Sequence, residues 1–398
     1  MSETRHLTGS GQQFITDFQK QDLDPIIAGS EERVAVTMPR PVCARPHKLP
    51  SDKWLLSSAV QKLIRRGKAE QAVKAALALH TLDPAYLPRR LPIIAFEDVS
   101  IGNLEVCFDA LFVFGRQRFA ASATDAEQRR VLANLVLRLA QSVKSRTACD
   151  IFCLAHADQN ISIAAAKFAR SSEQCLVAMA CDRSAAVTSR ALALHLLSGM
   201  TVQEGRWSRP VSRFNPAALS AVAERLDLSP VIRWMLINGR HTSGLAAMLP
   251  LALEAALNGT EALHVMQWKA NGAQVYSVKS IVGVPAYSAD QYTALGRQAI
   301  AEFSKAMKDK YSALFEGVPS ASKLLGMAIF HAEGSKLDRW VENPMIADYR
   351  RRIEQIELQV LGLAPELHQQ LYAVLETESR LLWQIRHDRL TSAFRGGK

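Results

Sequence analysis

Apolar residues recur every three or four positions along most of this chain, which is the pattern of amphipathic helices. Between Ser51 and Gly67 they line one side of a helix that Ser51 can cap. The same spacing continues over 69–80, onward from Pro84, over 104–119 and 125–141, through 144–200, and over 216–257. The pattern therefore predicts a mainly α fold, built as a multi-helix array with a further helical domain.

Interruptions of this pattern divide the chain into parts. The run from Met38 to Pro46 holds three prolines and cannot sustain a helix, and Gly205 to Pro210 breaks the pattern again. We predict an irregular N-terminal arm at 1–50, helical domains at 51–204 and 205–347, and a C-terminal helical pair at 348–398 that is broken near Gly362 and Pro365.

One segment has the alternation of β-strands. Residues 263–268 and 274–282 flank an Asn271-Gly272 pair, which favours a tight hairpin turn. A two-stranded hairpin is marginal alone, so it must pack on neighbouring helices or protrude. We expect a small β-hairpin near 263–282 within the second helical domain.

Composition indicates an ordinary globular protein. The chain has 398 residues, of which 48% are hydrophobic and 22% are charged, enough for two or three domains. It starts without the apolar region of a signal peptide, and no apolar stretch approaches the roughly 20 residues that span a bilayer. Six cysteines in so long a chain do not suggest a disulfide framework. We expect a cytoplasmic protein with reduced thiols and no membrane partner.

Two segments resemble a known family. The first runs from Lys53 through Arg89-Arg90 to Glu97-Asp98, and the second holds Lys144-Ser145. Together, over about 52–160, they are similar to the C-terminal region of replication-associated recombination protein A and Werner-helicase-interacting proteins. Two positions depart from that family: Phe96 replaces a usually small residue, and Val143 replaces a proline.

The resemblance implies a helical collar of the kind that holds subunits of clamp-loader-like ATPases together. By that analogy the chain forms a homo-oligomer, and Arg89, Arg90, Glu97, Asp98, Lys144 and Ser145 serve structure and assembly. The ATPase module is missing, because the chain has no Gly-x-x-x-x-Gly-Lys-Ser/Thr loop to hold phosphates. We expect no cofactor, and a separate ATPase as a possible partner.

Two basic clusters are candidate DNA contacts in a chain of net charge +10. Lys62, Arg65, Arg66 and Lys68 gather at one helix end, where they could meet phosphates or simply be solvated. Arg206, Trp207, Arg209 and Arg213 interleave guanidinium groups with aromatic residues, as single-strand binding surfaces do.

Two other sets could form sites. Asp290, Thr293 and Arg297 fall on one helix face as a polar site or a capped, salt-bridged helix start. Cys149, Cys153 and His156 share a helix face, but zinc needs a fourth ligand, so a buried apolar face is favoured and no metal is expected.

The function expected from the sequence is a noncatalytic accessory role in DNA replication, repair or mobile-element maintenance, through oligomerisation and DNA or ATPase contact. An enzyme acting on nucleic acid or a phosphorylated small molecule, with its site near 283–297, is the alternative. A pure protein-interaction scaffold is the third. A pocket that joins Asp290, Arg297 and a histidine would favour the enzyme, and a basic groove through Arg206 and Arg213 would favour DNA binding.

Overall fold

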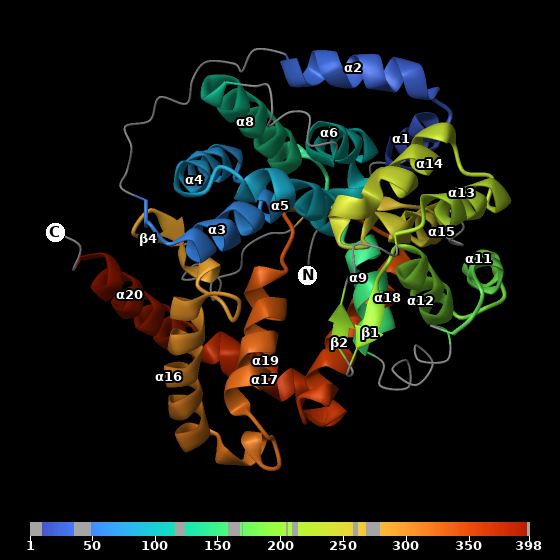
Figure 1. The fold of residues 1–398 in the computed structure, drawn as a ribbon. Coiled ribbons are helices and arrows are strands. Elements are labelled where there is room, and N and C mark those ends of the chain that lie inside the picture. Colours follow the sequence, from blue (N-terminus) through green and yellow to red (C-terminus); the bar gives the residue numbers. More distant parts are fainter. Residues whose placement is uncertain are drawn as a thin grey trace.

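The computed structural model confirms a mainly helical chain with a few short antiparallel strand pairs (Figure 1). No helix of the described part is long and apolar enough to cross a membrane. The structure describes residues 10–35, 49–115, 124–157, 168, 170–203, 206–208, 214–257, 262–267 and 279–395.

The first half of the chain forms the array of helices that the periodicity predicted. Asp52, rather than Ser51, caps the first predicted helix, because its carboxylate accepts the backbone N–H groups of Trp54 and Leu55 at 2.8 and 3.0 Å. Thr124 and Glu127 form a capping box at another helix start. The helices of this half are α3 (Lys53–Arg65), α4 (Ala69–Leu82), α5 (Tyr86–Ile94), the short η1 (Ala95–Val99) and η2 (Ser100–Gly102), α6 (Leu104–Gly115), α8 (Asp125–Gln141), α9 (Thr147–Ala157), α11 (Glu173–Cys181) and α12 (Val187–Leu197).

The second half is also helical, and its C-terminal part lies below the larger array in Figure 1. Its helices are α13 (Pro216–Arg225), α14 (Pro230–Asn238), η4 (Gly239–Thr242), η5 (Ala246–Met248), α15 (Leu249–Leu257), η7 (Ala286–Ser288), α16 (Ala294–Lys310), η8 (Ser312–Phe315), α17 (Ala321–Ile329), η9 (Phe330–Gly334), α18 (Pro344–Val360), η10 (Pro365–Leu367), α19 (His368–Thr377) and α20 (Ser379–Arg395). The predicted break near Gly362 and Pro365 is confirmed, but three long helices follow residue 343 instead of two. Glu378 separates the last two, where its carboxylate accepts Lys310 Nζ at 2.6 Å.

The prediction of an irregular arm at 1–50 is wrong for two stretches. Helices α1 (Ser10–Gln19) and α2 (Leu23–Ala35) form there. Ile15, Phe18 and Ile26 are buried in the main core, and Arg33 pairs with Asp109 at 2.8 Å. Packing on distant helices therefore supports segments whose own composition is unfavourable. The proline-containing run at 38–46 lies outside the described residues.

Strand β3 (His264–Gln267) pairs with a distant strand, and most of its predicted hairpin partner at 274–282 lies outside the described residues. The strand itself forms as predicted, and its antiparallel partner is β6 (Arg339–Glu342). The predicted Asn271-Gly272 turn lies outside the described residues. The other two pairs are β1 (Thr201–Gln203) with β2 (Arg206–Ser208), and β4 (Ser280–Ile281) with β5 (Val284–Pro285).

Buried apolar residues form two clusters. The larger contains residues from Ile15 to Leu390 on both sides of the predicted boundary at 205, and the smaller, from Ala299 to Ile385, lies on both sides of 348. The smaller cluster joins α16, α17, α19 and α20, which Figure 1 shows together. The predicted domain boundaries stay predictions.

Lys144 ties the two halves of the chain together. Its backbone N–H donates to Arg339 O at 2.8 Å, and its carbonyl accepts Val341 N at 3.0 Å. Its buried ammonium donates to Ala140 O at 2.8 Å and to Ser142 O. Burial lowers the pKa of Lys144 to about 7. The neighbouring Ser145 is also buried, and its hydroxyl lies 2.9 Å from that of Thr147. A role of either residue in assembly stays a prediction.

This lowered pKa gives the stability a defined pH dependence. Above pH 7 the folded chain has released the Lys144 proton, whereas the unfolded chain keeps it up to the ordinary lysine pKa of 10.5. We expect stability to rise by about 1.4 kcal/mol per pH unit between pH 8 and 9 from this one group. Urea unfolding of the wild type and of Lys144→Met measures it, because methionine keeps the backbone bonds and removes the titration. Parallel pH profiles of the two proteins would contradict the assignment.

Candidate ligand-binding cavity

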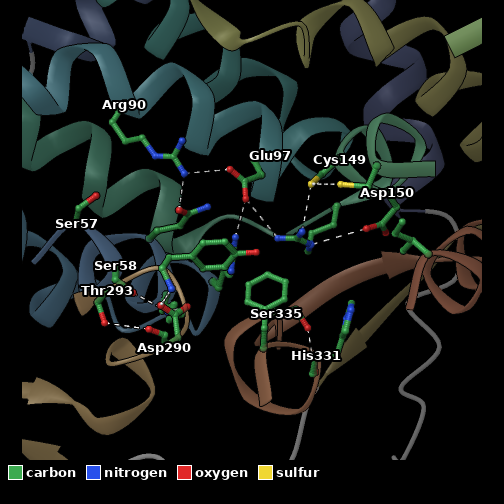
Figure 2. A pocket seen from close by; sticks show the side chains of 18 of the residues that line it. Ser57, Ser58, Arg90, Glu97, Cys149, Asp150, Asp290, Thr293, His331 and Ser335 are labelled. Carbon is green, nitrogen blue, oxygen red and sulfur yellow. Dashed lines mark hydrogen bonds and ion pairs between the residues drawn. The ribbon is translucent and has the colours of Figure 1, made fainter. Parts of the chain in front are cut away.

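A cavity of about 400 Å³ lies where the two halves of the chain meet. One side of the cavity is formed by α3, α5, η1 and α9. The other side is formed by η9, α18 and the residues just before α16. Figure 2 shows their polar side chains converging, with Ser57 and Arg90 toward one end and Asp150 toward the other. The size lies in the range of small-molecule sites.

A network of buried ion pairs forms the floor of the cavity. Arg65 of α3 pairs with Asp98 at 2.6 Å and with Glu97 at 2.9 Å. Arg146, just before α9, reaches the same Asp98 oxygen at 2.9 Å. Arg90 pairs with Glu97 at 3.3 Å, and Figure 2 shows Glu97 between Arg90 and Cys149. Three guanidinium groups thus share two adjacent carboxylates.

These contacts fix the geometry of the two carboxylates and the ionisation of Glu97. Burial alone would raise the pKa of Glu97, but Arg90, Arg65 and Arg146 hold it below its ordinary value. Arg65 also donates to the carbonyl of Gly334 at 2.8 Å, which links α3 to η9 across the cavity. The network therefore orients the cavity wall, and its members have few donors left for a ligand.

Asp290, Thr293 and Arg297 do not share one helix face as predicted, because α16 begins at Ala294 with Thr293 as its cap and Asp290 lies before the helix. A polar site at these residues stays a prediction. Asp290 and Thr293 are buried and line the cavity together with His331, whereas Arg297 is exposed and does not line it. Asp290 pairs with the buried ammonium of Lys62, whose pKa burial lowers to about 8 although Asp290 opposes the shift. Thr293 caps α16 through the Gly296 N–H at 3.0 Å.

The opposite end of the cavity holds groups suited to accept and donate protons. Nε2 of His331 lies 2.7 Å from Glu357 Oε2, so the carboxylate orients the imidazole. Asp150 of α9 is only 4% exposed, and burial raises its pKa although Arg146 and Arg350 oppose the shift. A carboxyl of raised pKa beside an oriented histidine is an acid–base arrangement.

Two thiols also face this end. Cys149 Sγ lies 4.0 Å from Cys153 Sγ and accepts a hydrogen bond from Arg146 Nη2 at 3.2 Å. The contact with Cys153, together with burial, raises the pKa of Cys149. His156 instead stacks on His195 with ring centroids 4.5 Å apart. Among the described residues no group of three or more His, Cys, Asp or Glu side chains could hold a metal ion.

Aromatic side chains complete the lining. Trp54 is 58% exposed and packs edge-on against Tyr86, with ring centroids 5.9 Å apart. Tyr292 is 60% exposed and packs edge-on against Phe330 at 5.5 Å. All four line the cavity. They give a charged interior an apolar, planar border.

The two predicted basic clusters differ in where the structure places them. Lys62, Arg65 and Arg66 are buried, so a solvated or DNA-facing surface is wrong for them, because carboxylates and carbonyls from distant segments enclose this helix end. Lys68 is exposed. Arg206 and Trp207 lie on β2 beside β1, while Arg209 and Arg213 lie outside the described residues. Of the predicted assembly residues, Arg89 is exposed and Arg90 joins the network.

Sequence reasoning missed several lining residues. Arg146, Asp150, Arg350 and Glu357 were not singled out, although Cys149 and Cys153 were, on the same helix as Asp150. Arg146 and Asp150, four residues apart at the start of the apolar α9, were an available signal.

Comparison with family models, with curated proteins and with solved structures finds no match to this chain. The cavity therefore has to be interpreted from its own chemistry.

Proposed function

We propose that this protein binds a small molecule with a planar ring and a polar group in the cavity between its two halves. The observation that carries the proposal is that Trp54 and Tyr292, both more than half exposed, line the same charged cavity. Aromatic rings on a cavity border offer a ligand large, rigid contact faces. The cavity includes Asp290 and Thr293 from the segment 283–297, where the alternative prediction places the site of an enzyme acting on nucleic acid or a phosphorylated small molecule.

The expected energy is large enough to measure. Covering about 100 Å² of exposed aromatic surface contributes about 2.5 kcal/mol, before polar contacts are counted. Because most charges of the interior are already paired with each other, polar contacts add selectivity more than affinity.

A ligand panel tests this function. Isothermal titration of the full chain with aromatic amino acids, nucleosides, nucleotides and flavins should give at least one ligand that binds and quenches tryptophan fluorescence. Tyr292→Ala and Trp54→Ala should each lower the affinity for that ligand by about tenfold, or 1.4 kcal/mol. Leu82→Ala is the matched control, since Leu82 is 46% exposed and does not line the cavity. Equal affinity of all variants would exclude the cavity as the site.

The accessory role in DNA replication, repair or mobile-element maintenance stays a prediction, as do the homo-oligomer and the separate ATPase partner. Its remaining candidate contacts are Lys68, Arg206, Trp207, Arg209 and Arg213, because Lys62, Arg65 and Arg66 are buried. Anisotropy of labelled DNA across a salt series, with Arg206, Arg209 and Arg213 replaced by alanine, tests it.

A further inference from the structure

Two cavity-lining side chains have a buried polar atom that no described residue satisfies. Oδ2 of Asp150 and Nη2 of Arg350 both lack a hydrogen-bond partner among the described residues. Such an atom costs about 1–3 kcal/mol, and more for a charged group. Unsatisfied groups of this kind, aimed into a cavity, indicate where a ligand makes its polar contacts.

The two groups do not satisfy each other. Arg350 Nη1 pairs instead with Glu342 at 2.8 Å, and the nearest cation to Asp150 is Arg146, with Nε 3.9 Å from Oδ1. Asp150 lies on α9 and Arg350 on α18, two helices that pack against each other. One acceptor and one donor therefore border the same end of the cavity.

The surrounding charges restrict what fits between them. A simple cation at Asp150 would face Arg146 and Arg350, and a simple anion at Arg350 would face Asp150 and Glu357. A neutral group that presents an N–H donor beside a carbonyl acceptor satisfies both side chains without adding charge.

We infer that Asp150 and Arg350 recognise the lactam edge of a guanine-type ring, the carboxylate accepting ring and amino N–H groups and the guanidinium donating to the ring carbonyl. This inference rests on the proposed function, and it specifies which class of ligand the same cavity binds. Arginine pairs well with the guanine carbonyl, and an ionised carboxylate only accepts hydrogen bonds, which matches adjacent N–H donors. The ring of Tyr292 supplies a planar face, and Phe330 packs edge-on behind it.

The ligand edge can be tested without changing the protein. Titration calorimetry of the wild-type chain should show guanosine binding at least about tenfold more tightly than 1-methylguanosine, which lacks the N1–H, and than phenylalanine. Guanosine monophosphate is the second arm. If guanosine monophosphate binds more tightly than guanosine, the ligand of the cavity is a nucleotide. If the two bind equally, it is a nucleoside.

Asp150→Asn supplies a selectivity test. Asparagine has nearly the same shape, but it presents an N–H₂ donor where the carboxylate only accepts. We expect the variant to lose at least about tenfold in guanosine affinity and to gain affinity for xanthosine, which has a carbonyl in place of the amino group. Asp309→Asn makes the same chemical change on the exposed surface of α16 and should leave both affinities unchanged.

The outcomes separate the two proposals. Equal binding of guanosine and 1-methylguanosine, or an Asp150→Asn variant that keeps the guanosine preference, would overturn the lactam assignment. So would phenylalanine binding without guanosine, a result that leaves the cavity as a ligand site. If no ring-bearing compound of either panel binds, both proposals fail. Circular dichroism of Asp150→Asn verifies that a lost affinity is not lost folding.

Discussion

Asp98→Ala is expected to lower the free energy of unfolding by about 3–5 kcal/mol. Asp98 is fully buried and receives hydrogen bonds from Arg65 at 2.6 Å, Arg146 at 2.9 Å and Gln61 at 2.8 Å. Without the Asp98 carboxylate, the buried guanidinium groups of Arg65 and Arg146 lose the closer of their two shared counter-charges and keep only Glu97. Urea unfolding followed by circular dichroism measures the loss.

Arg89→Ala is the control for this experiment. Arg89 belongs to the neighbouring helix α5 and is exposed, so its removal should change stability by less than about 0.5 kcal/mol. A loss below about 1 kcal/mol for Asp98→Ala would mean that the network is solvated in the folded chain. The cavity wall would then need another explanation.

Helices were the part of the fold that the sequence could predict. The helix α8 begins and ends where the periodicity places it, because its apolar spacing and its capping box at Thr124 are both local signals. Helix α1 was missed because its stabilisation comes from burial of Ile15 and Phe18 against distant helices. The partner of β3 was missed for a related reason: the pairing of His264 with Glu342 spans a long loop whose closure no local pattern specifies.

The cavity was predictable only in part. Asp290 and Thr293 were singled out because polar residues near a helix start are readable within a few residues, although Thr293 caps α16 and Asp290 precedes it. Lys62 and Arg65 were misinterpreted, since cations at a helix end usually extend into water. Their carboxylate partners, Asp290 and Asp98, lie far away along the chain, so nothing near α3 predicts that they are buried.

The same long-range contacts connect fold and site. Lys62 pairs with Asp290, Arg65 donates to Gly334, and Lys144 pairs with the β6 backbone. Each contact joins the first half of the chain to the second at the cavity or beside it. A ligand held between the halves would therefore favour the packed arrangement and raise its stability with the logarithm of ligand concentration above the dissociation constant.

Gly296 is the point at which the segment carrying Asp290 is held most tightly. A Cβ on Gly296 would lie 2.0 Å from Asp290 O and 2.4 Å from Asp290 N. Both atoms belong to backbone, so rotation of a side chain cannot relieve the clash. Gly296 also lies in the first turn of α16, where its backbone N–H donates to Thr293 Oγ1 at 3.0 Å.

Gly296→Ala is therefore expected to lower the free energy of unfolding by about 3 kcal/mol, although alanine favours helices by about 1 kcal/mol. It should also lower the affinity for any ligand of the cavity, because it displaces Asp290. Urea unfolding and calorimetry measure the two effects. Gly326→Ala is the matched control in α17, because its Cβ would meet only the flexible Gln291 side chain, at 3.0 Å, and should change stability by less than about 1 kcal/mol. Equal stability of the two variants would show that the Asp290 backbone moves freely, and that the cavity wall is not fixed by this close approach.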